Sequence, residues 1–147
     1  MFGDSKIVVL EDHKVFLKKN LPELKEPPKL LYRGSVNGWK MKDFHKLCDN
    51  KGPTLTLFLL PTNRICAGFT SESWETGFGK YKSDSKSLLF SFEAAVTATA
   101  TVTSTPTPTS YKVFPVKNPE KAIFCRNDYG PCFGDNELSA SYEPMNG

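Results

Sequence analysis

The sequence predicts one domain of mixed helix and strand, in which the strands form antiparallel hairpins. Its 147 residues are typical of a single domain. Two segments space their apolar residues as helices do, and several short segments alternate apolar and polar residues between turn signals. Hydrophobic residues make up 39% of the chain and charged residues 24%, which is ordinary globular usage and argues against wholesale disorder.

The first element is an amphipathic helix between residues 5 and 21, which Pro22 ends. Its apolar residues recur at helical spacing opposite several lysines, and they are Val9, Phe16, Leu17 and Leu21. The next stretch, 22–29, contains three prolines and alternating charge, which predicts a linker. We therefore expect an amino-terminal helix with a proline-rich linker at 1–29 and the main domain at 30–147.

A strand, a turn and a helix are expected to open the main domain. Residues 30–33 read as a short strand, and Asn37-Gly38 is a turn signal because both residues tolerate positive φ. A helix follows, and Gly52-Pro53 stops it. Its apolar face consists of Met41, Phe44, Leu47 and Cys48.

A β-hairpin comes next, with alternating strands at 54–60 and 64–70 joined by Pro61-Thr62-Asn63. Gly68 in the second strand predicts a bulge or a close backbone approach. We expect a long surface loop at 71–87, tied down by its aromatic residues. Further strands are expected at 88–92, 111–114, 122–125 and 138–142.

The tract 94–110 consists almost entirely of Thr, Ala, Val, Ser and Pro. Such a composition offers little burial to offset the entropy lost on ordering, which favours a flexible loop. Valine and alanine also alternate with threonine from 96 to 103, a pattern that suits two strands extending beyond the sheet. Both readings remain open from the sequence.

Charge and hydropathy exclude several classes of function. The net charge is only +3 and the lysines are interleaved with acids, so we expect no nucleic-acid partner. No apolar run approaches the length of a membrane span or of a signal-peptide core, which predicts an intracellular, cytoplasmic chain without membrane insertion. The four cysteines are expected to be free thiols, although a local bridge between Cys125 and Cys132 is open to the geometry.

Few residues suggest catalytic or metal chemistry. His45 and Cys48 lie three apart on the predicted helix, a spacing that two zinc ligands or a thiol–imidazole pair can use. Cys48 and Cys66 lie on faces that we expect to be buried, where thiols are inert, and His45 is expected to be partly exposed. Glu72 and Asp84 read as solvated charges. We therefore expect no catalytic residue, no metal and no cofactor.

Several ordered motifs resemble the TLDc domain. The amino-terminal motifs are Leu31-Tyr32-Arg33-Gly34-Ser35, Asn37-Gly38-Trp39, Asp43-Phe44-His45, Cys48-Asp49 and Lys51-Gly52-Pro53-Thr54-Leu55. The later ones are Ala67-Gly68-Phe69-Thr70-Ser71 followed by Trp74, Ser83-Asp84 leading to Phe92, Lys121-Ala122-Ile123, and Gly130-Pro131 with Phe133-Gly134. The resemblance runs from Leu30 to about Pro144, interrupted by the Thr-rich tract. Ala67 stands where the family commonly has glycine.

The resemblance implies an α+β fold of two antiparallel sheets packed as a sandwich with flanking helices. It also implies a non-enzymatic protein-interaction module, linked to oxidative-stress resistance and to binding the vacuolar proton-pumping ATPase. Candidate partner-binding residues are Trp74, Phe69 and Trp39, with a structural role for Trp74 as the alternative that we favour. The competing function is a redox-active or thiol-dependent enzyme that uses Cys48 or Cys66.

The family pattern continues into a further apolar strand beyond the point where this chain ends at Gly147. We therefore expect the family's last strand to be missing and a sheet edge to be left unpaired. We expect this edge to be covered by the amino-terminal helix, by the Thr-rich tract or by another molecule. The helix is the first choice, because it offers a large apolar face on a long linker.

Overall fold

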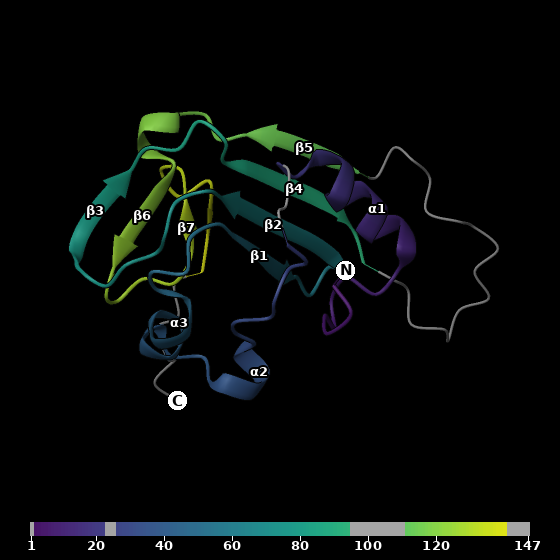
Figure 1. Cartoon of the computed structure of the whole chain (residues 1–147), viewed down its shortest axis with the longest axis horizontal. Coiled ribbons are helices and arrows are strands. Elements are labelled where there is room, and N and C mark those ends of the chain that lie inside the picture. The colour runs from purple at the N-terminus through teal and green to yellow at the C-terminus, as the bar shows by residue number, and fades with distance from the viewer. Residues whose placement is uncertain (1, 23–25, 95–110, 141–147) are drawn as a thin grey trace.

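The computed structural model describes residues 2–22, 26–94 and 111–140. Most of the Thr-rich tract, and the end of the strand expected at 138–142, therefore lie outside the described residues. The described part contains three α-helices, a 3-10 turn and eight strands arranged as two four-stranded antiparallel sheets (Figure 1). This arrangement confirms the expected α+β sandwich with flanking helices.

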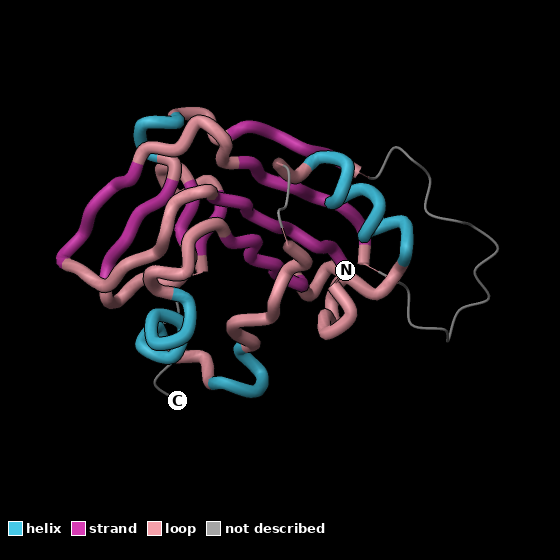
Figure 2. The backbone as a smooth tube through the Cα atoms, in the orientation of Figure 1, coloured by secondary structure: helices cyan, strands magenta, loops and turns pink. Residues whose placement is uncertain are grey.

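The first sheet has the order β1-β2-β4-β5 and the second the order β3-β6-β7-β8; Figure 2 shows them as two groups of strands. The helical elements are α1 (Glu11–Asn20), α2 (Gly34–Asn37), α3 (Met41–Cys48) and the 3-10 turn η2 (Pro119–Lys121). The strands are β1 (Thr54–Leu59), β2 (Arg64–Thr70), β3 (Phe78–Lys82), β4 (Leu88–Glu93), β5 (Lys112–Pro115), β6 (Ile123–Arg126), β7 (Cys132–Phe133) and β8 (Leu138–Ser139).

The predicted hairpin forms one side of the first sheet, with β1 at the edge and β2 next to β4. β1 and β2 pair in antiparallel register, with Leu57 opposite Ala67. Because side chains alternate across a strand, one face of β2 carries Ile65, Ala67 and Phe69, while Gly68 lies on the other face. Successive side chains of β2 therefore point alternately into the two cores of the molecule.

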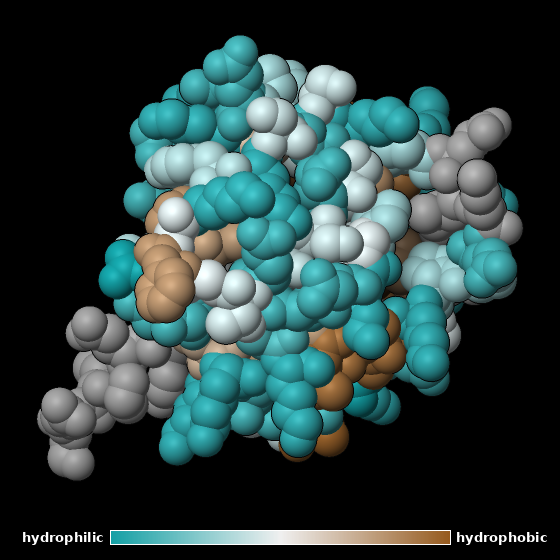
Figure 3. Space-filling view, turned by 60° about the vertical axis from the view of Figure 1, so that its left-hand side comes forward, coloured by the Kyte–Doolittle hydropathy of each residue, from teal (hydrophilic) through white to brown (hydrophobic). Residues whose placement is uncertain are grey.

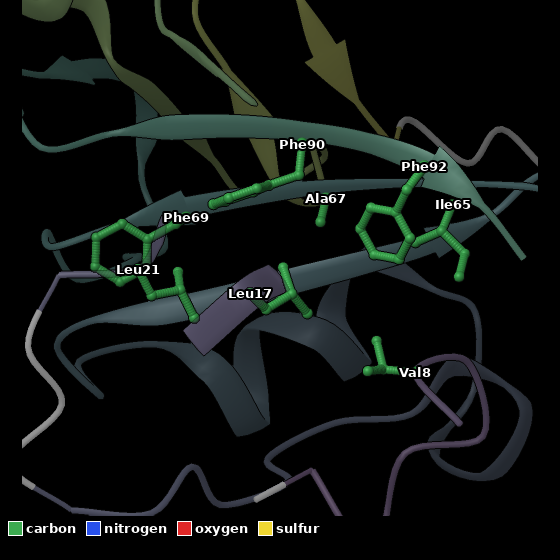
Figure 4. Packing of buried hydrophobic residues seen from close by; sticks show 8 residues of the cluster. All are labelled: Val8, Leu17, Leu21, Ile65, Ala67, Phe69, Phe90 and Phe92. Atoms are coloured by element: carbon green, nitrogen blue, oxygen red, sulfur yellow. The ribbon is translucent and has the colours of Figure 1, made fainter. Parts of the chain in front are cut away.

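The first core lies between α1 and the first sheet (Figure 4). Its buried residues are Val8, Leu17, Leu21, Ile65, Ala67, Phe69, Phe90 and Phe92. Leu17 on α1 is completely buried against this face. The expectation that the amino-terminal helix covers a sheet edge is therefore wrong, because its apolar face has a whole sheet face to bury against.

The amino-terminal helix is also shorter than expected. It begins at Glu11 and not near Ser5. The Ser5 hydroxyl accepts hydrogen bonds from the backbone N–H groups of Ile7, at 3.2 Å, and Val8, at 2.9 Å. Such local side-chain bonds hold a turn in place of a helix. Val8 consequently enters the first core from a non-helical segment.

The second core lies between the two sheets, with α3 at one end. Its buried residues are Phe44, Cys48, Trp74, Ile123, Cys125 and Phe133. Gly68 on β2 faces this core, and a Cβ at that position would lie 2.4 Å from the ring of Phe133. The predicted close approach at Gly68 is confirmed, since only a residue without a side chain lets Phe133 pack there.

Two predicted elements are wrong. Residues 30–33 form no strand; Leu31 and Tyr32 pack against the second core from an extended segment. The predicted loop at 71–87 contains β3, which pairs with β6. Four of its five residues are exposed, so β3 lacks the alternation of buried and exposed residues by which a strand is predicted from the sequence. It exists because its backbone pairs with a strand about 40 residues later.

Candidate interaction surface

Three large apolar residues are exposed on the segment that leads through α2 to α3. Leu30 is 46% exposed, Val36 70% and Trp39 60%; we call these three residues the α2 surface. Figure 3 shows a face of the molecule on which hydrophilic residues predominate and hydrophobic ones gather in small separate patches. Leu30, Val36 and Trp39 place three exposed apolar side chains within ten residues of sequence.

Local hydrogen bonds hold the backbone of the α2 surface in one conformation. The Tyr32 hydroxyl donates to the carbonyl of Gly38 at 2.6 Å, and the Arg33 N–H donates to Oδ1 of Asn37 at 2.8 Å. Gly38 follows α2 with a φ of +106°, as the turn signal predicts, whereas Asn37 is the last residue of that helix and does not adopt a positive φ. The carboxylate of Asp43 in α3 accepts from the Lys40 N–H at 3.3 Å.

The indole of Trp39 is held against the start of α2. A Cβ at Gly34 would lie 2.4 Å from the indole ring, so the ring packs directly on the Gly34 backbone. Trp39 nevertheless remains 60% exposed. A rigid, exposed aromatic side chain loses little conformational entropy on contacting a partner.

Lysines flank the residues of the α2 surface in the sequence. Lys29, Lys40 and Lys42 are all exposed, whereas the one acidic residue of this stretch, Asp43, is half-buried and bonded to the Lys40 N–H. The segment therefore combines exposed apolar residues with exposed lysines. Its chemistry suits a partner that offers an apolar contact beside carboxylates.

The other two predicted partner-binding residues are buried. Phe69 is 4% exposed in the first core, and Trp74 is 1% exposed in the second. The Trp74 indole N–H donates to the hydroxyl of Thr54 at 2.9 Å, and its ring packs edge-on against Phe44 and Phe133. The structural role favoured for Trp74 agrees with this packing, and of the three candidates Trp39 alone presents surface to a partner.

His45 is buried, which corrects the expectation that it is partly exposed. Its Nδ1 lies 2.7 Å from Oδ1 of Asp49, and its Nε2 lies 2.9 Å from the carbonyl of Arg126 and 2.8 Å from that of Tyr129. Both ring nitrogens thus face oxygen acceptors. The imidazole ties α3 to the β6–β7 connection and has no nitrogen free to take a proton from a thiol.

The cysteines show the features of packing residues. All four are free, and Cys48, Cys125 and Cys132 are buried. Burial raises the pKa of the Cys48 thiol to about 12, and it also raises the pKa of the Cys125 and Cys132 thiols. Cys66 is half-buried on β2, which differs from the burial that we expected. Thiols with raised pKa values carry almost no nucleophilic thiolate at neutral pH.

Asp84 is the buried charge that sequence reasoning missed. It is 6% exposed and accepts five hydrogen bonds, from the Thr70 hydroxyl, the Ser71 N–H and hydroxyl, the Lys86 N–H and the Ser87 hydroxyl. Burial raises the pKa of Asp84, but the hydrogen bonds from Ser71, Lys86 and Ser87 outweigh burial and hold it below its ordinary 3.8. This carboxylate fastens the end of β2 to the start of β4. The sequence signal for this buried carboxylate was the hydroxyl pair Thr70-Ser71, which lies 14 and 13 residues before Asp84.

Within the described ranges, no three residues among His, Cys, Asp and Glu come together as metal ligands would. No described helix combines the length and apolarity needed to cross a membrane.

The comparison with family models decides the identity of the fold. The model of the TLDc domain matches residues 2–143. The chain belongs to the TLDc family. In this TLDc domain the match includes α1 and the linker, ahead of the boundary predicted at residue 30. A search of curated proteins found no match.

Several of the motif residues that carry the TLDc resemblance stabilise the fold of this chain. Gly68 admits the ring of Phe133, Thr70 and Ser71 bind the carboxylate of Asp84, and Trp74 fills the space between the sheets. These residues account for the fold. Among the predicted site residues, the one that remains exposed is Trp39 on the α2 surface.

Proposed function

We propose that this TLDc domain is a non-enzymatic protein-interaction module that binds its partner through the α2 surface. The observation that carries the proposal is the 60% exposed indole of Trp39 on a backbone fixed by hydrogen bonds. Tryptophan is enriched at binding hot spots, and a preorganised anchor reduces the entropic cost of association. We expect the partner to offer an apolar pocket that receives the indole and acidic residues that pair with Lys29, Lys40 and Lys42.

The chemistry of the buried groups supports a non-enzymatic role. The competing proposal, a thiol-dependent enzyme, requires an accessible thiolate at Cys48 or Cys66 beside a base. Cys48 is buried with a raised pKa, and both nitrogens of His45 face other acceptors. We further propose that the domain acts in the cytoplasm, where free thiols persist.

Membership of the TLDc family supports one partner in particular. We propose that the domain binds the vacuolar proton-pumping ATPase and contributes to oxidative-stress resistance, as the family resemblance implies. An acidic, partly apolar patch on a pump subunit would match the α2 surface in both charge and hydropathy.

The test is capture of assembled proton-pump subunits by the full chain, with an established pump-binding TLDc protein as positive control. Trp39→Ala should weaken capture about 30-fold, as loss of a hot-spot residue does, and should leave the melting temperature unchanged because the indole is mostly exposed. Phe78→Ala is the matched control, since Phe78 is another exposed aromatic residue, on β3. No capture by the unaltered chain would refute the pump as partner, and equal losses in both variants would refute the α2 surface.

Native-state alkylation tests the thiol enzyme. We expect Cys66 to react first and slowly at neutral pH, with Cys48, Cys125 and Cys132 protected until the chain unfolds. Rapid, stoichiometric alkylation of Cys48 or Cys66 at mildly acidic pH would show a reactive thiolate and overturn the non-enzymatic proposal.

A further inference from the structure

The edges of the two sheets differ in how they are protected against pairing with other strands. Natural edge strands carry charges, prolines or bulges, or are very short. β3 has a bulge between Phe78 and Lys80 and carries lysines; β5 carries Lys112 and Pro115; β8 has two residues. The remaining edge, β1, has six residues with the sequence TLTLFL and none of these protections.

The hydrogen bonds of the hairpin show which backbone groups of β1 face outward. The Leu60 N–H donates to the Arg64 carbonyl at 2.8 Å, and the register places Leu59 opposite Ile65. In an antiparallel pair, hydrogen-bonded and non-hydrogen-bonded positions alternate. Thr54, Thr56 and Phe58 therefore bond to β2, and three leucines direct their N–H and C=O groups to the free edge. These are Leu55, Leu57 and Leu59.

No backbone hydrogen bond from the described residues reaches this free edge. The connecting segment 26–30, which leads from the α1 side to α2, is exposed along its whole length. Leu59 is 53% exposed and Leu60, just beyond the strand, 38%. The edge of β1 thus offers unpaired backbone groups and an apolar end in the part of the chain that the structure describes.

We propose that the free edge of β1 pairs with β1 of a second copy of this chain, antiparallel across a two-fold axis at Leu57. In this register Leu57 lies opposite its symmetry mate, and Leu55 lies opposite Leu59 of the other copy. All three outward-facing residues fall in hydrogen-bonded pairs, and at two bonds per pair they give about six hydrogen bonds.

The side chains favour the same register. Leu55, Leu57 and Leu59 share the face that continues into the first core, because they lie opposite Phe69, Ala67 and Ile65 of β2. Pairing centred on Leu57 keeps leucines against leucines on that face, so the apolar face continues from one copy into the next.

Charge favours a second copy at β1 over self-pairing at the other edges. β1 carries no charged side chain, so a two-fold pair brings no like charges together. Two-fold pairing of β3 with β3 of a second copy would bring Lys80 and Lys82 close to the same lysines of the other copy. Two-fold pairing of β5 would likewise bring the two copies of Lys112 close together. Like charges directly opposite each other destabilise strand pairs. This dimer is independent of the function proposed for the α2 surface.

The first test measures the mass of the full chain by sedimentation across a wide concentration range. The unaltered chain should reach twice the monomer mass with rising concentration. Leu59→Lys should raise the dimer dissociation constant at least about tenfold, because it places charge on an exposed residue within the paired strand. Leu60→Lys, which adds the same charge just outside the strand, is the matched control and should change it little. A chain that stays monomeric throughout would overturn the proposal, as would equal effects of the two variants.

The second test fixes the register by cross-linking in a Cys66→Ser background. Residues opposite each other in a hydrogen-bonded pair have Cα atoms about 5.5 Å apart, which a disulfide spans. Leu57→Cys should therefore cross-link two copies under mild oxidation, whereas Leu55→Cys should not, because Leu55 faces Leu59 of the other copy. A dimer in which Leu57→Cys fails to cross-link would rule out this register and the proposal with it. Both variants are compared only after their melting temperatures confirm folding.

Discussion

Single residues in this domain act through hydrogen bonds that span the chain. Asp84 joins the ends of β2 and β4 by accepting from Thr70, Ser71 and Ser87, and His45 joins α3 to two carbonyls that lie more than 80 residues later. Both side chains are buried and their polar atoms are paired, as buried polar groups must be to avoid a large desolvation cost. These residues hold the sandwich together in the places where apolar packing alone would not fix its loops.

Asp84→Asn should lower the free energy of unfolding by about 2 to 4 kcal/mol at neutral pH. The amide replaces a charged acceptor by a weaker one and turns a donor toward the donors around it. The pKa of Asp84 is depressed in the folded state, so its stabilisation is present above the ordinary value of 3.8 and is lost as the pH falls through the folded-state pKa. Urea titrations at pH 7 and below pH 4 measure both effects. A variant as stable as the parent at pH 7 would contradict this role.

At the scale of elements, α1 depends on the first sheet for its stability. Its ten residues are too few for an independently stable helix in water, and its buried face provides the missing free energy. That face includes His13, which is completely buried beside the rings of Phe92 and Tyr111. Neither of its nitrogens has a hydrogen-bond partner among the described residues.

The docking of α1 should therefore weaken in acid. Burial lowers the pKa of His13 below its ordinary 6.5, although the nearby Asp12 carboxylate acts in the opposite direction. Below about pH 6.5 His13 becomes protonated in the unfolded chain but stays neutral in the folded one. The free energy of unfolding should therefore fall as the pH drops toward the folded-state pKa, by at most about 1.4 kcal/mol per pH unit.

His13→Phe removes the titrating group and keeps an aromatic ring in the first core. Its free energy of unfolding should change less with pH between about 6.5 and 5 than that of the unaltered chain. Denaturant titrations across this range measure the difference. An identical pH dependence in the two proteins would show that His13 does not govern the docking of α1.

At the scale of the whole molecule, the distance between the two sheets is set by small residues facing large ones. Gly68 on β2 lies directly under Phe133 on β7, which in turn packs edge-on against Trp74 at 5.3 Å between ring centroids. Protein interiors are packed densely enough that one added methyl group forces neighbours to move. The two sheets can approach this closely only while position 68 has no side chain.

Gly68→Ala should destabilise the domain by about 1 to 3 kcal/mol, because its Cβ would lie 2.4 Å from the Phe133 ring. Combining it with Phe133→Leu should cost less than the sum of the two single changes, since the smaller side chain makes room. Gly77→Ala is the control, because a Cβ there meets nothing within 4 Å. Thermal unfolding measures all four variants, and full additivity of the double variant would contradict a direct clash.

Much of the architecture follows from the sequence because its signals are local. The alternation of three leucines with Thr54, Thr56 and Phe58 predicts β1, and the helical spacing of Phe44 and Cys48 predicts α3. The ordered motifs around Gly68 and Trp74 were enough to reveal the TLDc resemblance, which the family comparison confirms. Each of these features depends on the spacing of apolar residues within one element and on the turn residues beside it.

Tertiary structure alone decided where these elements pack and which aromatic residues reach the surface. β3 forms because β6 is there to pair with it, and α1 lies on a sheet face because Phe90 and Phe92 gather there. Trp39 and Trp74 both belong to motifs that carry the TLDc resemblance, yet one is exposed and the other buried. Burial depends on residues far along the chain, such as Phe133 against Trp74, and a local pattern carries no information about such partners.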